Sequence, residues 1–417
     1  MPDSISGIEE GYKIMRAFFT ENIERIYSSF MLTLLCIVFL LNHSNQNSSQ
    51  SMATLLLLLS PLMIIRKPSS DSLPFGLRYF IASSLALFAY SLMIFFHHAP
   101  SEIAWTSMRG LSFYLLAPVA VYILWYKPPS MQFIFWLTFS ATLFSLYPVI
   151  KEYFGHGARG ATSAHPIFWG NVCLTTGVVI FILSRDKQLK LRGKNLIGLI
   201  GLAMGLTASF WSQTRGGWLS IPIVLIALAL FRVVKVRELL IASIILVVIF
   251  STSEMLQKRL LATIETSNSG FHLDTSTQRR IDMWNVSIQA FEENYALGNG
   301  LDGFSRKIKE LREKNEVKFY FEHAHNEVME VLASRGIIGL VLLISLISGL
   351  LLTYWRHRKS TYAIAGLIST GQFLIYSTSE VFFSTKFTIT YFLILQSLLL
   401  IACYKVNSHK SVPNEIS

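Results

Sequence analysis

Long apolar segments recur along almost the whole of this 417-residue sequence. A helix satisfies its own backbone polar groups in lipid, so an apolar run of about 18 residues with few charges predicts a transmembrane helix. The repeated runs exclude an ordinary soluble protein and predict an all-α polytopic membrane protein with about twelve spans. The approximate cores of the predicted spans are residues 26–41, 51–65, 79–96, 111–126, 131–150, 166–184, 195–210, 218–231, 239–250, 337–354, 362–379 and 387–404.

Most of the positive charge lies in short segments between these runs, and the formal net charge is +11. Cytoplasmic loops carry an excess of Lys and Arg, so this pattern indicates membrane topology and not nucleic-acid binding. If the N-terminus is inside, the inside segments hold Arg66, Lys67, Arg78, Lys127, Arg185, Lys187, Lys190, Arg192, Lys194, Arg232, Lys235, Arg237, Arg356, Arg358, Lys359, Lys405 and Lys410. We therefore predict cytoplasmic N- and C-termini, with the first apolar run an uncleaved span.

The short segments on the predicted outer side hold few cations. These are Arg109, Lys151, Arg159, Arg215 and Lys386. They run against the charge bias, so each of them requires an explanation, either as an anchor at the membrane boundary or as part of a binding site.

One long polar segment, residues 252–335, interrupts the apolar pattern. It is nearly neutral, with 11 Lys and Arg against 13 Asp and Glu, and the same topology places it in the periplasm of a bacterium with two membranes. The chain is thus predicted to divide into an N-terminal membrane region (1–251), a large periplasmic loop (252–335) and a C-terminal membrane region (336–417). Loops of this length are usually functional or disordered, and the sequence here is not of low complexity.

Helical spacing indicates that the loop is folded. Apolar and polar positions recur at helical intervals over residues 280–291 and 325–336, which predicts two helices. The segment GNGLDG (residues 298–303) fits a dinucleotide-binding glycine pattern, but no strand precedes it. We interpret it as a glycine-rich turn between helices.

Arginines at two outside positions are candidates for binding an anion. Arg215 precedes Gly216 and Gly217 at the start of a span, and it is either a snorkelling anchor or a ligand-binding residue beside a close backbone approach. Arg280 follows Arg279, and it is either a solvated helix residue or part of a clamp, since the guanidinium matches phosphate oxygens bidentately. Arg159 lies in another glycine-rich outside segment and could line the same cavity.

His325 is the candidate general base, because histidine titrates near neutral pH. A surface or helix-capping role is the alternative. His323 and His325, together with Glu322 and Glu327, could also be metal ligands. The H-x-H spacing and the lack of companion Cys or His residues argue against zinc, so we expect no metal and no other cofactor. Arginines and a histidine on one face suggest an anionic, lipid-linked substrate whose pyrophosphate leaves as a hydroxyl attacks.

Three segments, taken in order, resemble the O-antigen ligase family within the ligase and polymerase superfamily of lipopolysaccharide assembly. They are QTRGGWLS from residue 213, RRIDMWNVSIQAFEENYALGNGLDGF from residue 279, and HAHNEVMEVLASRGIIGL from residue 323. The second segment has two adjacent arginines where the family needs one. The spacing to Trp284 selects Arg280, and Arg279 stays open.

The resemblance implies an inner-membrane glycosyltransferase of the all-helical, GT-C-like type. Such an enzyme moves O-antigen polysaccharide from undecaprenyl pyrophosphate to a sugar hydroxyl of lipid A-core, with inversion and without a metal. Arg215 and Arg280 would hold the pyrophosphate, and His325 would activate or orient the acceptor hydroxyl. Arg159, Arg279, Trp284 and Asn326 would complete the substrate site.

Two other functions compete with a ligase. An O-antigen polymerase would share the donor and the fold. A transporter for a lipid-linked anion should show internal repeats and ionisable groups near the bilayer midplane, and neither is evident. The expected partners are the lipid-linked donor, the lipid A-core acceptor and inner-membrane lipids, with no nucleic acid.

Overall fold

The computed structural model describes residues 25–61, 73–154, 165–238 and 275–408, together with residues 240, 244 and 251. All regular elements within these ranges are helices. They are the helix Arg25–Leu41, α2 (Gln46–Leu59), α4 (Phe75–His97), α5 (Glu102–Leu111), η1 (Ser112–Leu115), α6 (Leu116–Tyr126), α7 (Met131–Phe144), α8 (Leu146–Pro148), η2 (Val149–Phe154), α9 (Pro166–Ser184), α10 (Lys194–Trp211), α11 (Arg215–Leu230), α14 (Thr275–Glu293), α15 (Gly303–Glu313), α16 (Glu327–Arg356), α17 (Thr361–Ser377) and α18 (Lys386–Ser408).

Six helical stretches in the described part of the chain are long and apolar enough to cross a membrane. They are Phe75–His97, Glu102–Tyr126, Met131–Glu152, Pro166–Ser184, Glu327–Arg356 and Lys386–Lys405. Two shorter apolar helices accompany them, Arg25–Leu41 and Gly216–Leu230. The all-helical, multi-pass character expected from the sequence is confirmed. The count of twelve spans stays a prediction, and the span predicted over 239–250 lies largely outside the described residues.

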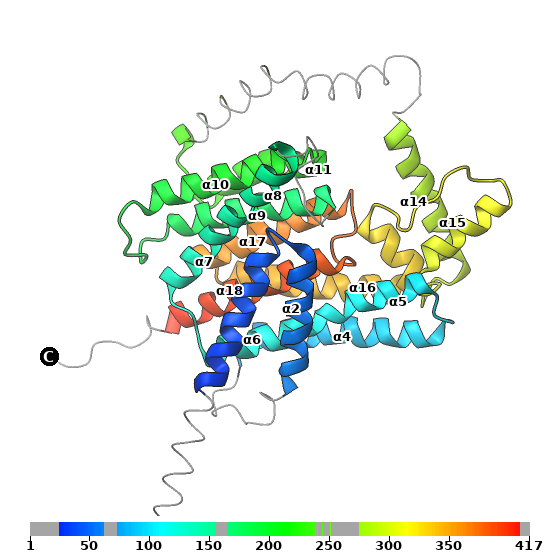
Figure 1. The fold of residues 1–417 in the computed structure, drawn as a ribbon, viewed down its shortest axis with the longest axis horizontal. Helices are drawn as coiled ribbons and strands as arrows, with labels where there is room; N and C mark the ends of the chain where they lie inside the picture. The colour runs from blue at the N-terminus through cyan, green and yellow to red at the C-terminus, as the bar shows by residue number, and fades with distance from the viewer. Residues whose placement is uncertain are drawn as a thin grey trace, which may run out of the picture.

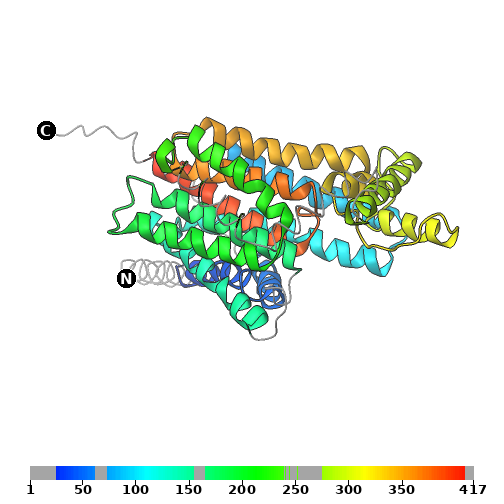
Figure 2. The same cartoon turned by 90° about the horizontal axis from the view of Figure 1, so that it is seen from above.

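Two of the long helices form the centre of the membrane region. Within their most apolar windows, 94% of α9 and 94% of α18 is buried inside the protein, against 39% of α4 and 39% of α16. A helix that is apolar all round and buried belongs at the core, whereas a half-exposed apolar helix faces lipid. In Figures 1 and 2 the long helices run roughly side by side, with α9, α17 and α18 between the outer helices.

Helices α14 and α15 project beyond one end of the long helices (Figures 1 and 2), and the end of α18 lies at the opposite end. They have their own small apolar core, which joins them to the segment before α16 and to its first turns. Its buried members are Met283, Val286, Ala290, Phe304, Ile308, Leu311, Ala324 and Ala333. The helices predicted over 280–291 and 325–336 are therefore confirmed.

A glycine-rich turn fixes this small core to α16. Gly336 interrupts α16 with φ 62° and ψ −165°, and Gly298 packs directly against the interruption. A Cβ on Gly298 would lie 2.5 Å from the backbone nitrogens of both Arg335 and Gly336. The Ile337 N–H donates to the carbonyl of Tyr295 at 2.9 Å. The predicted turn between two helices is confirmed, and its glycines permit a close backbone approach.

Candidate functional site

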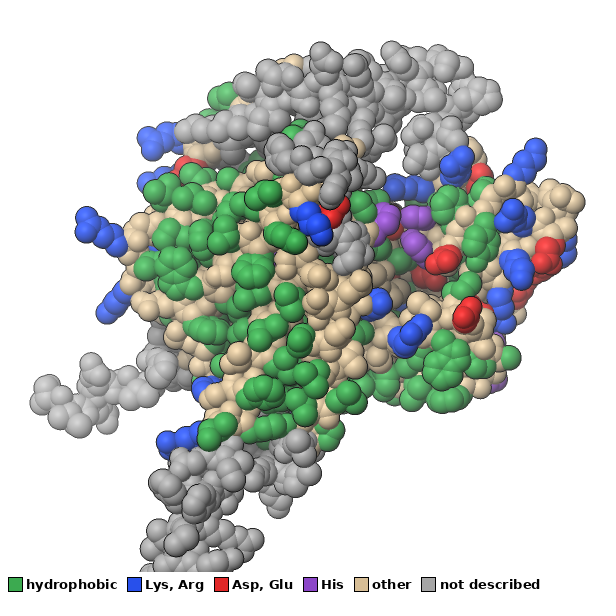
Figure 3. Space-filling model, viewed as in Figure 1, with side chains coloured by type: hydrophobic (Ala, Val, Ile, Leu, Met, Phe, Trp, Pro, Cys, Tyr) green, Lys and Arg blue, Asp and Glu red, His purple; other side chains and the backbone are tan. Residues whose placement is uncertain are grey.

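A buried carboxylate, Glu380, joins two histidines at the end of the long helices where α14 and α15 project. His325 Nδ1 lies 2.8 Å from Glu380 Oε1, and His323 Nε2 lies 3.6 Å from Glu380 Oε2. The Glu380 side chain is 1% exposed, that of His325 18% and that of His323 34%. Figure 3 shows histidine side chains grouped where the membrane helices meet the projecting part.

The electrostatics of this group keep Glu380 ionised. Burial by itself raises the pKa of the Glu380 carboxyl, but its contacts with His323 and His325 outweigh burial and lower the pKa to about 2. Burial lowers the pKa of His323, yet the contact with Glu380 and the nearby charge of Glu330 raise it overall. Because an ionised carboxylate only accepts hydrogen bonds, His325 Nδ1 is the donor. Nε2 is then the His325 nitrogen that can take a proton.

Asn326 fixes the backbone next to His325. Its Oδ1 accepts the Met329 N–H at 3.2 Å and so caps the start of α16, while its Nδ2 donates to the carbonyl of Thr378 at 3.2 Å. His325 itself has φ 48°, a left-handed conformation that costs free energy in a non-glycine residue. Asn326, expected to contact substrate, thus has a positioning role, and its contact with substrate stays a prediction.

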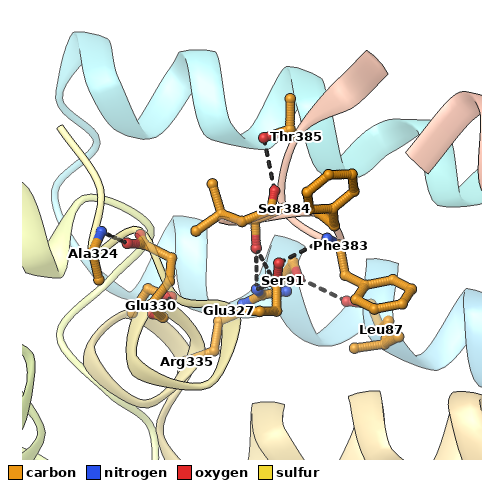
Figure 4. A network of polar contacts seen from close by, with 12 residues as sticks. Leu87, Ser91, Ala324, Glu327, Glu330, Arg335, Phe383, Ser384 and Thr385 are labelled. Carbon is orange, nitrogen blue, oxygen red and sulfur yellow. Dashed lines mark hydrogen bonds and ion pairs between the residues drawn. The ribbon is translucent and has the colours of Figure 1, made fainter. Parts of the chain in front are cut away.

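Glu327 ties the same segment to the connection between α17 and α18 (Figure 4). Its Oε2 accepts the Phe383 N–H at 2.7 Å, and its Oε1 accepts the Ser384 hydroxyl at 2.6 Å. Arg335 Nη2 donates to Ser384 Oγ at 2.8 Å and lies 3.8 Å from Glu327 Oε1. Glu327, two residues after His325, is therefore bonded to Phe383, three residues after Glu380. This contact fixes the segment that carries His325 relative to the segment that carries Glu380. Glu327, suggested by the sequence as a carboxylate beside the histidines, serves this network instead.

The turn that carries Arg215 reaches the same connection from another side. A Cβ on Gly216 would come within 2.7 Å of Ser379 Oγ, next to Glu380. Helix α11 is held there through Ser220 Oγ, 3.4 Å from the hydroxyl of Tyr376 on α17. The structure describes the backbone of Arg215, whereas its side chain lies outside what is described, and Arg159 lies outside the described residues altogether.

Helix α14 brings the second motif to this region. Met283 belongs to the small core that contains Ala324 and includes Met329 at its edge, and Arg280 lies one turn before Met283 on the same helix face. Arg280 is half-buried, whereas Arg279 is exposed. The indole N–H of Trp284 is buried with no hydrogen-bond partner among the described residues. The two arginines thus differ in burial, and the choice between them stays a prediction.

The three side chains His323, His325 and Glu380 could also hold a metal ion, since one ligand atom from each lies within 4.8 Å of the others. Glu380 is far from the two histidines in sequence, so the H-x-H spacing alone does not reveal this group. Two ligands of one tetrahedral zinc ion lie about 3.3 Å apart. The 2.8 Å contact between His325 and Glu380 is instead a hydrogen bond, which fits a base and its orienting carboxylate.

Comparison with known protein families gives a match. Residues 200–344 match the O-Antigen ligase family model. The resemblance inferred from the sequence is confirmed over this segment, which contains Arg215, Arg280 and His325, whereas Arg159 and Glu380 lie outside it. Proteins of this family are membrane glycosyltransferase-like enzymes, ligases or polymerases.

A relative from Haemophilus influenzae, named only as an uncharacterized protein, is 25% identical over 237 residues. The similarity covers 51% of this chain and 58% of the relative. Its name assigns no activity, so the family match alone carries functional information.

One residue of this group, Glu380, was not predicted. A signal for it exists in the sequence, because Glu380 is a lone acid in the short segment between the last two apolar runs. Membrane topology depends on Lys and Arg in such segments and hardly on acids, so charge counts do not single out Glu380.

Proposed function

We propose that this protein is an O-antigen ligase of the bacterial inner membrane. It would transfer O-antigen polysaccharide from undecaprenyl pyrophosphate to a sugar hydroxyl of lipid A-core on the periplasmic side. The twelve-span, GT-C-like topology with both termini in the cytoplasm belongs to this proposal. The observation that carries it is the hydrogen bond between His325 and buried Glu380. The Gly216 turn contacts Ser379, the neighbour of Glu380, and α14 shares a small core with Ala324, the neighbour of His325.

The proposed reaction is a single in-line displacement. His325 Nε2 takes the proton of the acceptor hydroxyl, and the hydroxyl oxygen forms a bond to the anomeric carbon of the donor's first sugar. The bond from that carbon to the pyrophosphate oxygen breaks, the pyrophosphate leaves with the electron pair, and the configuration inverts. Glu380 orients the imidazole and stabilises the imidazolium that forms, as a buried carboxylate does for a general-base histidine.

The arginines neutralise the leaving group in this proposal. Arg215 and Arg280 would bind the pyrophosphate as charge develops on it, because guanidinium groups match phosphate oxygens bidentately. Arg159 and Arg279 would add positive charge at the edge of the site. The unpartnered indole N–H of Trp284 offers a further donor. No metal or other cofactor is required when arginines carry this charge.

The lipopolysaccharide banding pattern of a strain lacking the protein tests the proposal. A ligase deletion leaves bare lipid A-core while undecaprenyl-linked polymer accumulates. Wild-type protein restores the pattern, and His325→Ala does not. His97→Ala removes an exposed histidine and should restore it. A single repeat unit on the core in the deletion strain would instead identify a polymerase. Full rescue by His325→Ala would remove His325 from the mechanism.

A further inference from the structure

Two of the outward cations that run against the charge bias, Arg109 and Lys386, have no role in the mechanism above. Arg109 is exposed on α5, where its Nη2 donates to Thr106 Oγ1 at 3.2 Å. Lys386 is the first residue of α18 and is half-buried. Lys and Arg are disfavoured in short segments on the outer side of a membrane. Two such cations in one place therefore indicate a binding site.

The structure brings the backbones of these two residues together. Helix α5 packs against the start of α18, so a Cβ on Gly110, the neighbour of Arg109, would lie 3.5 Å from the backbone nitrogen of Lys386 and 3.7 Å from its Cβ. Like charges carried on such close backbone positions repel each other, and an anion bound between them would remove that repulsion.

No carboxylate in the described part of the chain forms an ion pair with either cation. Nearby acids are engaged elsewhere: Glu327 with Ser384 and Phe383, and Glu380 with the histidines. Lys386 also stands at a helix N-terminus, where the helix dipole adds positive potential. The pair is therefore a concentration of uncompensated positive charge, the condition that attracts a phosphate group.

The position along the membrane normal fits a lipid phosphate. In the proposed orientation both α5 and α18 start at the outer surface. Arg109 lies seven residues after Glu102, which is about 10 Å along the helix, and Lys386 lies at the start of its helix. Both cations thus lie near the outer boundary of the hydrocarbon region, at the level of lipid headgroups.

The connection from α17 to α18 separates this pair from the donor arginines. Its beginning, Ser379, contacts the Gly216 turn, and its end, Ser384, contacts Gly110. Glu380 lies between those two contacts. The Gly216 turn and helix α5 therefore contact opposite ends of the short connection that carries Glu380, and an enzyme that brings two lipid-linked substrates together needs two such separate binding places.

We propose that Arg109 and Lys386 bind a phosphate group on the lipid portion of the acceptor glycolipid. This assignment rests on the proposed ligase function. It identifies the part of the protein that would recognise the acceptor. Each cation contributes a charge-assisted hydrogen bond to the phosphate, so the loss of either should weaken acceptor binding about tenfold.

The test uses the purified full-length protein with an intact acceptor and with the same acceptor after enzymatic removal of its lipid phosphates. Arg109→Gln and Lys386→Gln are compared with Lys151→Gln, which removes an exposed cation from another outward segment. We expect each of the first two variants to raise KM for the intact acceptor about tenfold, with donor KM and kcat unchanged. All proteins should bind the dephosphorylated acceptor equally. Arg109→Lys and Lys386→Arg should restore most of the affinity.

A direct binding measurement separates failure of this inference from failure of the ligase proposal. Native mass spectrometry reports acceptor binding even if wild-type protein transfers nothing. A preference for the intact over the dephosphorylated acceptor that is lost in both Gln variants supports the site. Unchanged acceptor binding in both variants overturns it. An equal effect of both variants on phosphatidylglycerol binding also overturns it, because the pair would then hold bulk phospholipid.

Discussion

Glu380 holds the ring of His325 through a 2.8 Å hydrogen bond to Nδ1, although the two residues are 55 positions apart in the chain. Glu380 is 1% exposed, so the carboxylate lies behind the imidazole and leaves the other ring nitrogen for chemistry. Most of the expected behaviour of the site follows from this contact.

Glu380→Gln should reduce kcat about 100-fold or more while leaving both KM values nearly unchanged. The amide can still accept a hydrogen bond from Nδ1, but it is neutral and cannot stabilise an imidazolium. The measurement is the initial rate of polysaccharide transfer by purified protein, with the exposed Glu313→Gln as control. A wild-type kcat in Glu380→Gln would show that the carboxylate does not assist His325.

The contact between His323 and Glu380 should make stability depend on pH. The folded pKa of His323 is raised above its ordinary value of 6.5, so its stabilising effect is fully present below pH 6.5 and is lost as the pH rises through the folded pKa. Glu380, with a pKa of about 2, stays ionised throughout this range. The melting temperatures of wild type and His323→Gln should therefore differ more at pH 5.5 than at pH 9. A difference that does not change with pH would contradict this.

Removing one member of the buried Glu327–Arg335 pair should destabilise the protein strongly, whereas replacing both members by apolar residues should destabilise it much less. Each side chain is 2% exposed. Glu327→Leu leaves Arg335 buried without its carboxylate and should lower the free energy of unfolding by about 3–5 kcal/mol. The double variant Glu327→Leu with Arg335→Leu should recover much of that loss. Thermal unfolding in detergent measures both, and a double variant no more stable than the single one would show that the hydrogen bonds to Ser384 and Phe383 dominate.

Gly298→Ala should destabilise the junction between the projecting helices and α16. The substitution places a Cβ 2.5 Å from the backbone of Arg335 at a position with φ +72°, which combines a clash with about 1–2 kcal/mol of conformational strain. Gly193→Ala has the same φ with open space around it, so it reports the strain alone. Gly371→Ala has neither feature and lies inside α17, where alanine is the better helix former, so it should not lower the melting temperature. Equal melting temperatures for Gly298→Ala and Gly193→Ala would contradict the close packing.

EDTA should not inhibit transfer if His323, His325 and Glu380 work as a base with its carboxylate. The check is transfer by purified protein after prolonged chelation, followed by addition of single divalent ions. Inhibition that one ion reverses would make these three side chains a metal centre, with His325 a ligand and not a base.

The sequence by itself determined the helical class of this protein, most of the apolar helices in the described residues, the helices around Arg280 and after His325, and the turn at Gly298. Hydrophobic periodicity and glycine spacing are local properties, and they are set by residues a few positions apart. The three motifs and their order can also be read directly from the sequence. They indicated the family whose model matches residues 200–344.

Only the tertiary structure decided which residues meet. The packing of α16 against the connection between α17 and α18 chooses Glu380 as the partner of His325 and assigns Glu327 to Ser384 and Phe383. The packing of α5 against the start of α18 likewise places Gly110, the neighbour of Arg109, against the backbone of Lys386. The physical reason is that these contacts join segments separated by dozens to hundreds of residues, so they depend on how whole helices pack and leave no periodic trace in the sequence.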